Sequence, residues 1–471
     1  MGLHGALFCN RLGPISFPGQ IAWAKNADTD IGYGIVLPGN ENHSVSQENQ
    51  YTVQRHEYSV LLKVVNQILA WASKIGSSCC DLDQASLLKT AKEKAGLEDW
   101  GNNNFLTPME RLLAEADQCR LTHFARTLTR QALLTALDNR LQVQQFLTAS
   151  PKLRDTKIER PIFVVGFPRT GTTVLQNLLS LPANRRALQF WEMMKPAPLH
   201  EDPIKDRRVR LEKAERTLAL AYWVAPEQRE VHEIQATTFE ECWPLFVNAF
   251  SVMNYDLASG LEGYGDWLMG QDMVGPYREY RAQLQILLDR EPADQLVLKC
   301  PEHLWFLDAL LEVFPDACII WTHRDPIASI ASYCSLVSLN RRMLYGQCDP
   351  IDLGRHISQR FLTGVQRAMA VRDKVGEERF YDVDFLQLVQ NPKQVLERVH
   401  GHFGLKQPND MDAQIDGWLN NKRSDAKGRH RYAAERYGLD AETVHGRYAE
   451  YIQRFDIPLG TRPKTASRAT N

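Results

Sequence analysis

The strongest indication of the fold is the stretch Pro161-Ile162-Phe163-Val164-Val165-Gly166-Phe167-Pro168-Arg169-Thr170-Gly171-Thr172-Thr173. Residues 161–166 form a short run of β-branched and aromatic side chains that ends at a glycine, which is typical of a buried strand. Residues 174–181 continue with apolar side chains at helical spacing. The backbone N–H groups of residues 169–173 then converge at the positive end of a helix, so the sequence predicts an anion site there.

The glycine spacing of this loop matches the Walker A phosphate loop, but the lysine of that motif is absent. Thr172 takes its position, and the cation of the loop is Arg169. Because the Walker lysine reaches the β- and γ-phosphates, its absence argues against ATP with magnesium. An arginine fork suits a donor with one bridging phosphate and a terminal sulfuryl group. The alternative interpretation is that the loop is only a structural turn rich in glycine and threonine. The predicted anion-binding residues are Arg169, Thr170, Gly171, Thr172 and Thr173.

Three later segments repeat the buried-strand pattern, with helical spacing between them. Strands that alternate with helices favour a parallel sheet covered on both faces. The sequence therefore predicts an α/β protein with a P-loop-like fold, in which helices flank a central parallel sheet and an N-terminal helical domain precedes it. The predicted strands are Leu296–Lys299, Cys318–Thr322 and Phe380–Val383, and the predicted helices are Trp305–Val313, Ile327–Leu336 and Pro392–His402.

Composition divides the chain into three parts. Residues 1–52 are rich in Gly, Asn, Ser and Pro without sustained periodicity, which predicts a loosely ordered N-terminal extension. Residues 53–155 carry apolar side chains at helical spacing and few strand signals, which predicts a small helical domain. Residues 156–471 carry the alternating strands and helices and form the third predicted domain.

A second anion site is predicted at His-Arg-Asp-Pro, residues 323–326, directly after a predicted strand. Ser332 follows Arg324 by eight residues, within the next predicted helix. The two side chains can meet over the carboxyl edge of the sheet, where open α/β folds bind ligands. An arginine with a hydroxyl group makes a good phosphate clamp.

This motif has two other interpretations. His-Arg-Asp also occurs in the catalytic loop of protein kinases, but that motif requires an asparagine where this chain has Ile330. The remaining alternative is structural, with Arg324 and Asp325 as a pair that caps the next helix. Two separate phosphate sites would suit a nucleotide that carries phosphate at both ends.

These motifs resemble those of the sulfotransferases that use 3'-phosphoadenosine 5'-phosphosulfate (PAPS). Residues 161–180 resemble the 5'-phosphosulfate loop of that family. Phe190–Pro196 is similar to the segment that follows the loop in a bacterial-type branch. The interval from Arg324 to Ser332 is similar to the family's 3'-phosphate motif. The resemblance covers roughly residues 85–465.

The resemblance implies a reaction and a donor. PAPS is the expected donor co-substrate, and a sulfuryl group passes in line to a hydroxyl, or alternatively an amine, of a small-molecule acceptor. No metal is required. The resemblance implies that residues 156–471 are the sulfotransferase domain. Lys427 and Arg429 lie in a segment that resembles the family's C-terminal basic loop, which closes over the 3'-phosphate. A solvated basic face is the alternative for that loop. The rival functions are a nucleotide-dependent phosphotransferase and a module that binds 3'-phosphoadenosine 5'-phosphate (PAP) without turnover.

Two cations are expected to hold the leaving phosphate. Arg169 lies in the loop, and Lys299 ends a predicted strand just before Pro301, at the sheet edge where the loop is expected. Lys299 resembles a lysine that contacts the transferring group in related enzymes. A lysine on the surface is the alternative. Cations at this position stabilise the charge that develops on the departing oxygen.

The general base has two main candidates. Glu192 follows a tryptophan and precedes two methionines, and apolar neighbours raise a carboxyl pKa toward a useful range. It is also similar in position to the catalytic glutamate of tyrosylprotein sulfotransferases. His232 matches a histidine of the bacterial-type branch and titrates near neutral pH. His303 is a weaker third candidate. Glu240 and Glu241 are expected either to line an acceptor pocket or to form the first turn of a helix.

Overall composition excludes several classes. The 55 basic and 57 acidic residues give a net charge of -2, which does not favour nucleic-acid binding. Nine cysteines without metal-site spacing indicate a reducing compartment. No apolar run reaches the roughly 18–20 residues of a membrane helix. The expected location is therefore the cytoplasm, without membrane or nucleic-acid partners, and the oligomeric state stays open.

Overall fold

A computed structural model describes residues 60–231, 233–424 and 433–460, which belong to the compact unit His56–Asn471. The predicted N-terminal extension, residues 1–52, lies outside the described residues. His232, Lys427 and Arg429 also lie outside them.

The centre of the fold is a five-stranded sheet in which every pair of neighbouring strands is parallel, in the order β2-β3-β1-β4-β5. Four strands confirm the prediction to within a residue or two at each end. The short β2 was not predicted, because its sequence Arg-Arg-Ala has no apolar run. The strands are β1 Ile162–Gly166, β2 Arg185–Ala187, β3 Gln295–Lys299, β4 Cys318–His323 and β5 Phe380–Asp384.

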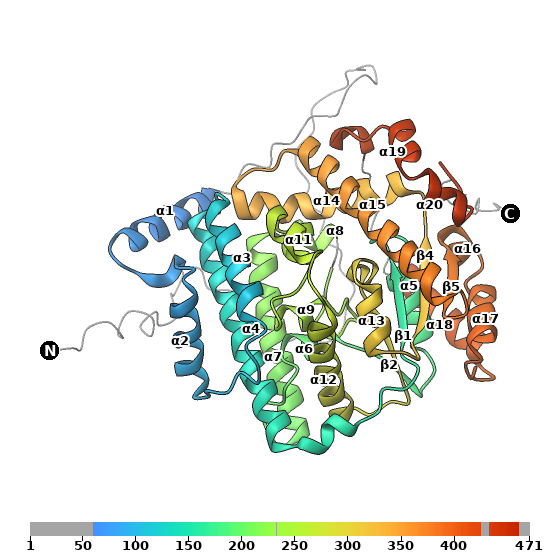
Figure 1. The fold of residues 1–471 in the computed structure, drawn as a ribbon, viewed down its shortest axis with the longest axis horizontal. Helices are drawn as coiled ribbons and strands as arrows, with labels where there is room; N and C mark the ends of the chain where they lie inside the picture. The colour runs from blue at the N-terminus through green and yellow to red at the C-terminus, as the bar shows by residue number, and fades with distance from the viewer. Residues whose placement is uncertain (1–59, 232, 425–432, 461–471) are drawn as a thin grey trace, which may run out of the picture. The chain divides into compact units, whose positions relative to one another are not determined.

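Both faces of the sheet are buried, as the apolar strands predicted. Ile162 and Val164 of β1 pack into a cluster with α5, α16, α17 and α18. Phe163 and Val165 point to the other face, because successive side chains of a strand alternate, and pack into a larger cluster with α12 to α15. Figure 1 shows the strands between α13 on one side and α16 to α18 on the other. The predicted α/β fold is confirmed.

The helices on either side of the sheet follow the predicted pattern, with two differences. The helix predicted at Ile327–Leu336 continues to Tyr345. The predicted helix Trp305–Val313 is a 3-10 turn, Pro301–Trp305, followed by α13, since the chain bends at Phe306. The helices that cover the sheet are α5 Thr172–Leu179, α12 Val274–Arg290, α13 Leu307–Val313, α14 Pro326–Tyr345, α15 Pro350–Val375, α16 Phe385–Gln390, α17 Pro392–Phe403 and α18 Met411–Ser424.

The region before the sheet is helical, as predicted. Buried side chains of α2, α3 and α4 join the same apolar cluster as Phe163 of β1. The division into separate domains stays a prediction. The helices are α1 Val60–Lys74, α2 Gln84–Ala95, α3 Leu106–Gln118 and α4 His123–Ala149, with 3-10 turns at Ser78–Cys80 and Pro151–Asp155.

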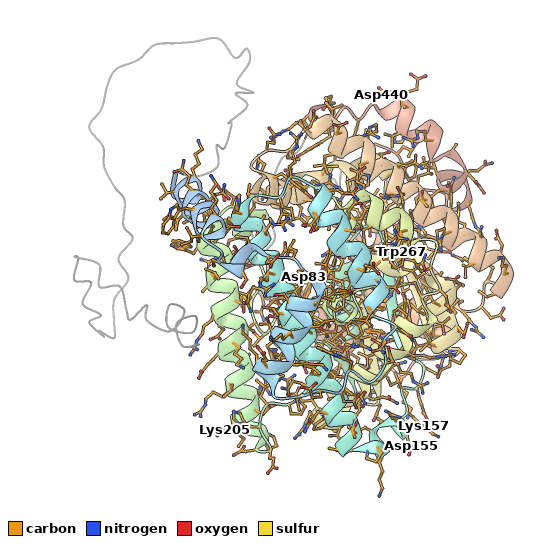
Figure 2. All side chains as sticks on the ribbon, turned by 60° about the vertical axis from the view of Figure 1, so that its left-hand side comes forward. Asp83, Asp155, Lys157, Lys205, Trp267 and Asp440 are labelled. Atoms are coloured by element: carbon orange, nitrogen blue, oxygen red, sulfur yellow. The ribbon has the colours of Figure 1, made fainter. Side chains whose placement is uncertain are left out.

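A long helical insertion separates β2 from β3, and short helices follow α18. The insertion holds α6 Phe190–Met194, α7 Pro203–Val224, α8 Gln228–Val231, α9 Trp243–Val247, α10 Asn254–Leu257 and α11 Glu262–Leu268, and the C-terminal part holds a 3-10 turn, Ala434–Tyr437, α19 Ala441–Arg447 and α20 Ala449–Arg454. Charged side chains such as Lys205, Lys157 and Asp440 lie at the periphery (Figure 2). Within the described residues, none of the helices combines the length and apolarity that crossing a membrane requires.

Candidate active site

The loop after β1 has backbone conformations that require glycine at two positions. Gly166 has φ 140°, and a Cβ there would lie 2.3 Å from Thr322 Oγ1, so β4 leaves room only for glycine. Gly171, with φ 88°, starts helix α5. Arg169 also has a positive φ, 71°, which is uncommon for a non-glycine residue. This conformation turns the loop above the carboxyl end of the sheet and leaves the first N–H groups of α5 without intrahelical partners.

The two predicted anion motifs meet at this loop. Arg169 Nε donates a hydrogen bond to Ser332 Oγ at 3.1 Å, and Arg324 Nη1 donates to the backbone oxygen of Arg169 at 2.7 Å. The Arg324 guanidinium also lies over the ring of Phe385, 4.4 Å from its centroid. Arg169 is exposed and Ser332 is buried. The side chains at 169, 324 and 332 therefore form one cluster at the tips of β1 and β4.

Thr170 and Thr322 hold the loop to the neighbouring strand. The buried Thr170 hydroxyl donates to the oxygen of Phe167 at 2.7 Å and lies 2.6 Å from Thr322 Oγ1. Its side chain therefore serves the loop, and its predicted part in anion binding rests on the backbone N–H. Thr172 is buried and Thr173 is exposed. Thr322 was not among the predicted site residues, although its place beside the His-Arg-Asp motif was the available signal.

Asp325 is the helix cap that the structural interpretation expected. Its carboxylate accepts a hydrogen bond from the Ile327 N–H at 3.2 Å, at the start of α14. His445 Nε2 lies 2.9 Å from the same oxygen, Oδ1, and the Gly460 N–H donates to Oδ2 at 2.9 Å. The cap fixes the turn that carries Arg324. The structural interpretation is thus confirmed for Asp325, whereas the role of Arg324 in anion binding stays a prediction.

Lys299 lies at the same sheet edge. It is the last residue of β3, pairs in register with Val164 of β1, and is only 1 % exposed. Its ammonium nitrogen lies 3.2 Å from Oε1 of Glu241. A buried lysine requires such a partner, because an isolated buried charge is strongly unfavourable. The ion pair with Glu241 was not predicted.

The Glu192 carboxylate is engaged in holding its own helix. One oxygen accepts the N–H of Gln189 at 2.8 Å, which completes a capping box at the start of α6. The other oxygen accepts a hydrogen bond from the Arg186 guanidinium. Burial lowers the pKa of this guanidinium to about 10. The predicted role of Glu192 as a base stays a prediction. These contacts alone account for its burial.

His303 has the surroundings of a core histidine. It is fully buried, with Nδ1 2.7 Å from the Tyr277 hydroxyl and Nε2 3.4 Å from Cys242 Sγ. Its ring packs edge-on against Phe163 of β1. Both ring nitrogens thus have protein partners, which does not favour proton exchange with a substrate.

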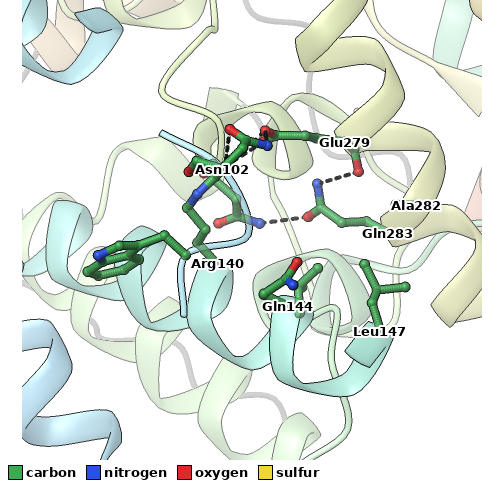
Figure 3. A pocket seen from close by; sticks show the side chains of 10 residues that line it. Asn102, Arg140, Gln144, Leu147, Glu279, Ala282 and Gln283 are labelled. Atoms are coloured by element: carbon green, nitrogen blue, oxygen red, sulfur yellow. Dashed lines mark hydrogen bonds and ion pairs between the residues drawn. The ribbon is translucent and has the colours of Figure 1, made fainter. Parts of the chain in front are cut away.

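A small cavity lies between α4 and α12, away from the predicted site residues. Its volume is about 60 Å³, and Arg140, Asn102, Gln283 and Glu279 are among its lining residues (Figure 3). Ligand sites typically measure roughly 300–1,000 Å³, so this space suits ordered water rather than a nucleotide. Across the described ranges, no group of three or more His, Cys, Asp or Glu side chains is arranged to hold a metal ion.

Comparison with known proteins identifies the family. The model of the sulfotransferase family matches residues 161–409, which include the loop, Lys299 and both residues of the second anion motif. The chain belongs to the sulfotransferase family. The resemblance inferred from the two motifs is confirmed, and so is the prediction of a sulfotransferase enzyme.

Two solved sulfotransferase structures resemble this sulfotransferase over most of its length. STF1 from Mycobacterium tuberculosis H37Rv has a TM-score of 0.69 and 28% identity, and the match covers 78% of this chain and 98% of that one. STF9 from Mycobacterium avium has a TM-score of 0.70 and 27% identity, over 80% and 98% of the two chains.

A relative with a named acceptor is more distant. Stf3 of Mycobacterium bovis and Mycobacterium tuberculosis, described as an omega-hydroxy-beta-dihydromenaquinone-9 sulfotransferase, is 25% identical over 311 residues. The match covers 60% of this chain and 72% of Stf3.

Proposed function

We propose that this sulfotransferase takes its sulfuryl group from PAPS and transfers it to a hydroxyl group of a small-molecule acceptor. The observation that carries the proposal is the cluster of Arg169, Ser332 and Arg324, in which the two anion motifs are joined by hydrogen bonds of 3.1 and 2.7 Å. A donor with phosphate groups at two positions uses both motifs, whereas ATP needs only the loop.

The residues of the cluster divide the donor between them. The first N–H groups of α5 and the Arg169 guanidinium suit the 5'-phosphosulfate, because a helix N-terminus and a cation both favour an anion. Arg324 and Ser332 suit the 3'-phosphate. The protein groups at this site are backbone N–H, guanidinium and hydroxyl groups, all of which can donate hydrogen bonds to phosphate oxygens. The described residues contain no metal-binding cluster.

The transfer requires a base and a stabilised leaving group. The acceptor oxygen forms a bond to sulfur as the bond from sulfur to the 5'-phosphate oxygen breaks, and the acceptor proton passes to a base. PAP leaves with the bonding electrons. Arg169 and Lys299 stabilise the charge that builds on the departing phosphate.

For the acceptor, the first class to test is an alcohol on a large apolar molecule. The acceptor in the name of Stf3 is a hydroxylated menaquinone derivative, and that protein is 25% identical to this one. Aromatic side chains of the insertion, such as Trp243 and Tyr255, are only partly buried against the core and suit an apolar wall. Cytoplasmic location, and the absence of nucleic-acid and membrane partners, remain predictions.

Titration calorimetry with PAP, AMP and ATP with magnesium tests the donor. We expect PAP to bind most tightly, because AMP lacks the 3'-phosphate and ATP places its charge at one end. Transfer is then measured by mass spectrometry with PAPS and a panel of aliphatic alcohols, phenols and amines. Binding of ATP with magnesium in preference to PAP, or PAP binding without transfer to any acceptor, would contradict the proposal.

A further inference from the structure

We propose that Glu241 is the general base of the transfer, an inference that rests on the proposed function. The segment that carries Glu241 is fixed across the carboxyl ends of the strands. The Glu240 N–H donates to the oxygen of Leu188, just after β2, at 3.2 Å. The Cys242 N–H donates to the oxygen of Lys299, at the end of β3, at 3.0 Å. Glu241 lies between these two anchors and therefore at the edge where the loop binds anions.

The side chain of Glu241 connects a buried cation to the outside. Its Oε1 lies 3.2 Å from the Lys299 ammonium, which is 1 % exposed, whereas the Glu241 side chain is 30 % exposed. A base in this place touches the cation that holds the leaving phosphate. It can also return its proton to solvent after each turnover, which a fully buried carboxylate cannot do directly.

Three other carboxylates, those of Glu192, Glu302 and Glu240, are less suited to this role. Both oxygens of Glu192 are engaged: one accepts a hydrogen bond from the Arg186 guanidinium, and the other accepts the backbone N–H of Gln189. Glu302 is buried, accepts the N–H of Met253 at 3.0 Å, and has a pKa that burial raises to about 8, so it is protonated at neutral pH. A protonated acid cannot accept the acceptor's proton. Glu240 is also buried, and its Oε1 accepts the Thr238 hydroxyl at 3.2 Å.

The ion pair supplies a route for the proton and the charge. The acceptor hydroxyl approaches between Glu241 and the sulfuryl group, and its proton passes to the carboxylate as the oxygen attacks sulfur. Lys299 loses part of its attraction to Glu241 when that carboxylate is neutralised. The ammonium is then available to the phosphate oxygen that gains charge in the same step. The proton on Glu241 finally exchanges with water.

The test compares Glu241→Gln with a matched control, Glu279→Gln. Glu279 is 24 % exposed and pairs with a buried cation, Arg140, at 2.6 Å, but it lines the small cavity between α4 and α12 (Figure 3). Both variants are assayed per mole of folded protein, with PAP affinity from calorimetry. We expect Glu241→Gln to lower kcat by about 10²–10⁴-fold, the range for loss of a general base, with PAP affinity within about threefold of the wild type. The control should retain kcat.

A second readout separates proton transfer from a merely electrostatic role. Nitrophenols lose their proton readily, so the loss of kcat in Glu241→Gln should be much smaller for a nitrophenol than for an aliphatic alcohol. The acidic limb of the profile of kcat/KM against pH should also disappear. An equal loss for both acceptors, or a kcat close to wild type, would overturn the assignment of Glu241 alone. A wild-type enzyme that binds PAP but sulfates nothing would overturn the proposed function as well.

Discussion

Replacing Arg324 with alanine tests the division of the donor between the two anion motifs. Arg324 follows β4, donates to the oxygen of Arg169 at 2.7 Å and lies over the ring of Phe385. If its guanidinium also binds the 3'-phosphate, Arg324→Ala removes a charge-assisted hydrogen bond that AMP does not make. The variant should therefore weaken PAP binding more than AMP binding.

The expected size follows from the kind of bond that is lost. A hydrogen bond to a charged group contributes about 1.5–3 kcal/mol, which corresponds to roughly 12- to 140-fold in Kd. The contact with the Arg169 oxygen is exposed. Its loss, with that of the stacking on Phe385, should lower the free energy of unfolding by only about 1 kcal/mol.

The assay is calorimetric titration of wild type and Arg324→Ala with PAP and with AMP at one salt concentration. The dissociation constant for PAP, divided by that for AMP, should be larger in the variant than in the wild type by the factor given above. Arg160→Ala is the control, because Arg160 also donates to a backbone oxygen, that of Phe403, but precedes β1 and so lies at the opposite edge of the sheet. Equal weakening of PAP and AMP in Arg324→Ala would refute the assignment of Arg324 to the 3'-phosphate.

Three further variants test the loop and its surroundings. Gly166→Ala should abolish PAP binding and lower the free energy of unfolding by about 3 kcal/mol, since the new Cβ would lie 2.3 Å from Thr322 Oγ1, whereas Gly275→Ala, with no atom within 4 Å, should be neutral in urea unfolding. Thr322→Val should lower the free energy of unfolding by about 1–2 kcal/mol, because the buried contact with Thr170 is lost, and unchanged stability would contradict that view. Burial raises the pKa of Glu302 from 4.5 to about 8, so between these values the folded chain holds a proton that the unfolded chain has lost. The wild type should therefore lose stability as pH rises from about 4.5 to about 8. Glu302→Gln should lack that loss, and parallel pH profiles of thermal unfolding would show that Glu302 does not titrate as inferred.

Local patterns in the sequence were enough to predict the glycine loop and most of the sheet. A buried apolar strand, a glycine turn and a helix start are local patterns, and the strands β1, β3, β4 and β5 follow from runs of apolar side chains. The two motifs at Arg169 and Arg324 could be read from their residues because each lies within one strand–helix connection. The short β2 has no such pattern, since its pairing with β3 rather than its own residues makes it a strand.

Which side chains lie next to one another at the candidate site depends on the fold of the whole chain. Lys299 and Glu241 are 58 residues apart, and they pair because the segment before α9 is bonded across the ends of β2 and β3. Likewise, Arg169 reaches Ser332 because β1 and β4 are neighbours in the strand order. Strand order and the path of a long insertion depend on the packing of the whole core. No local pattern records them, and the partners of buried charges therefore became visible only in the folded chain.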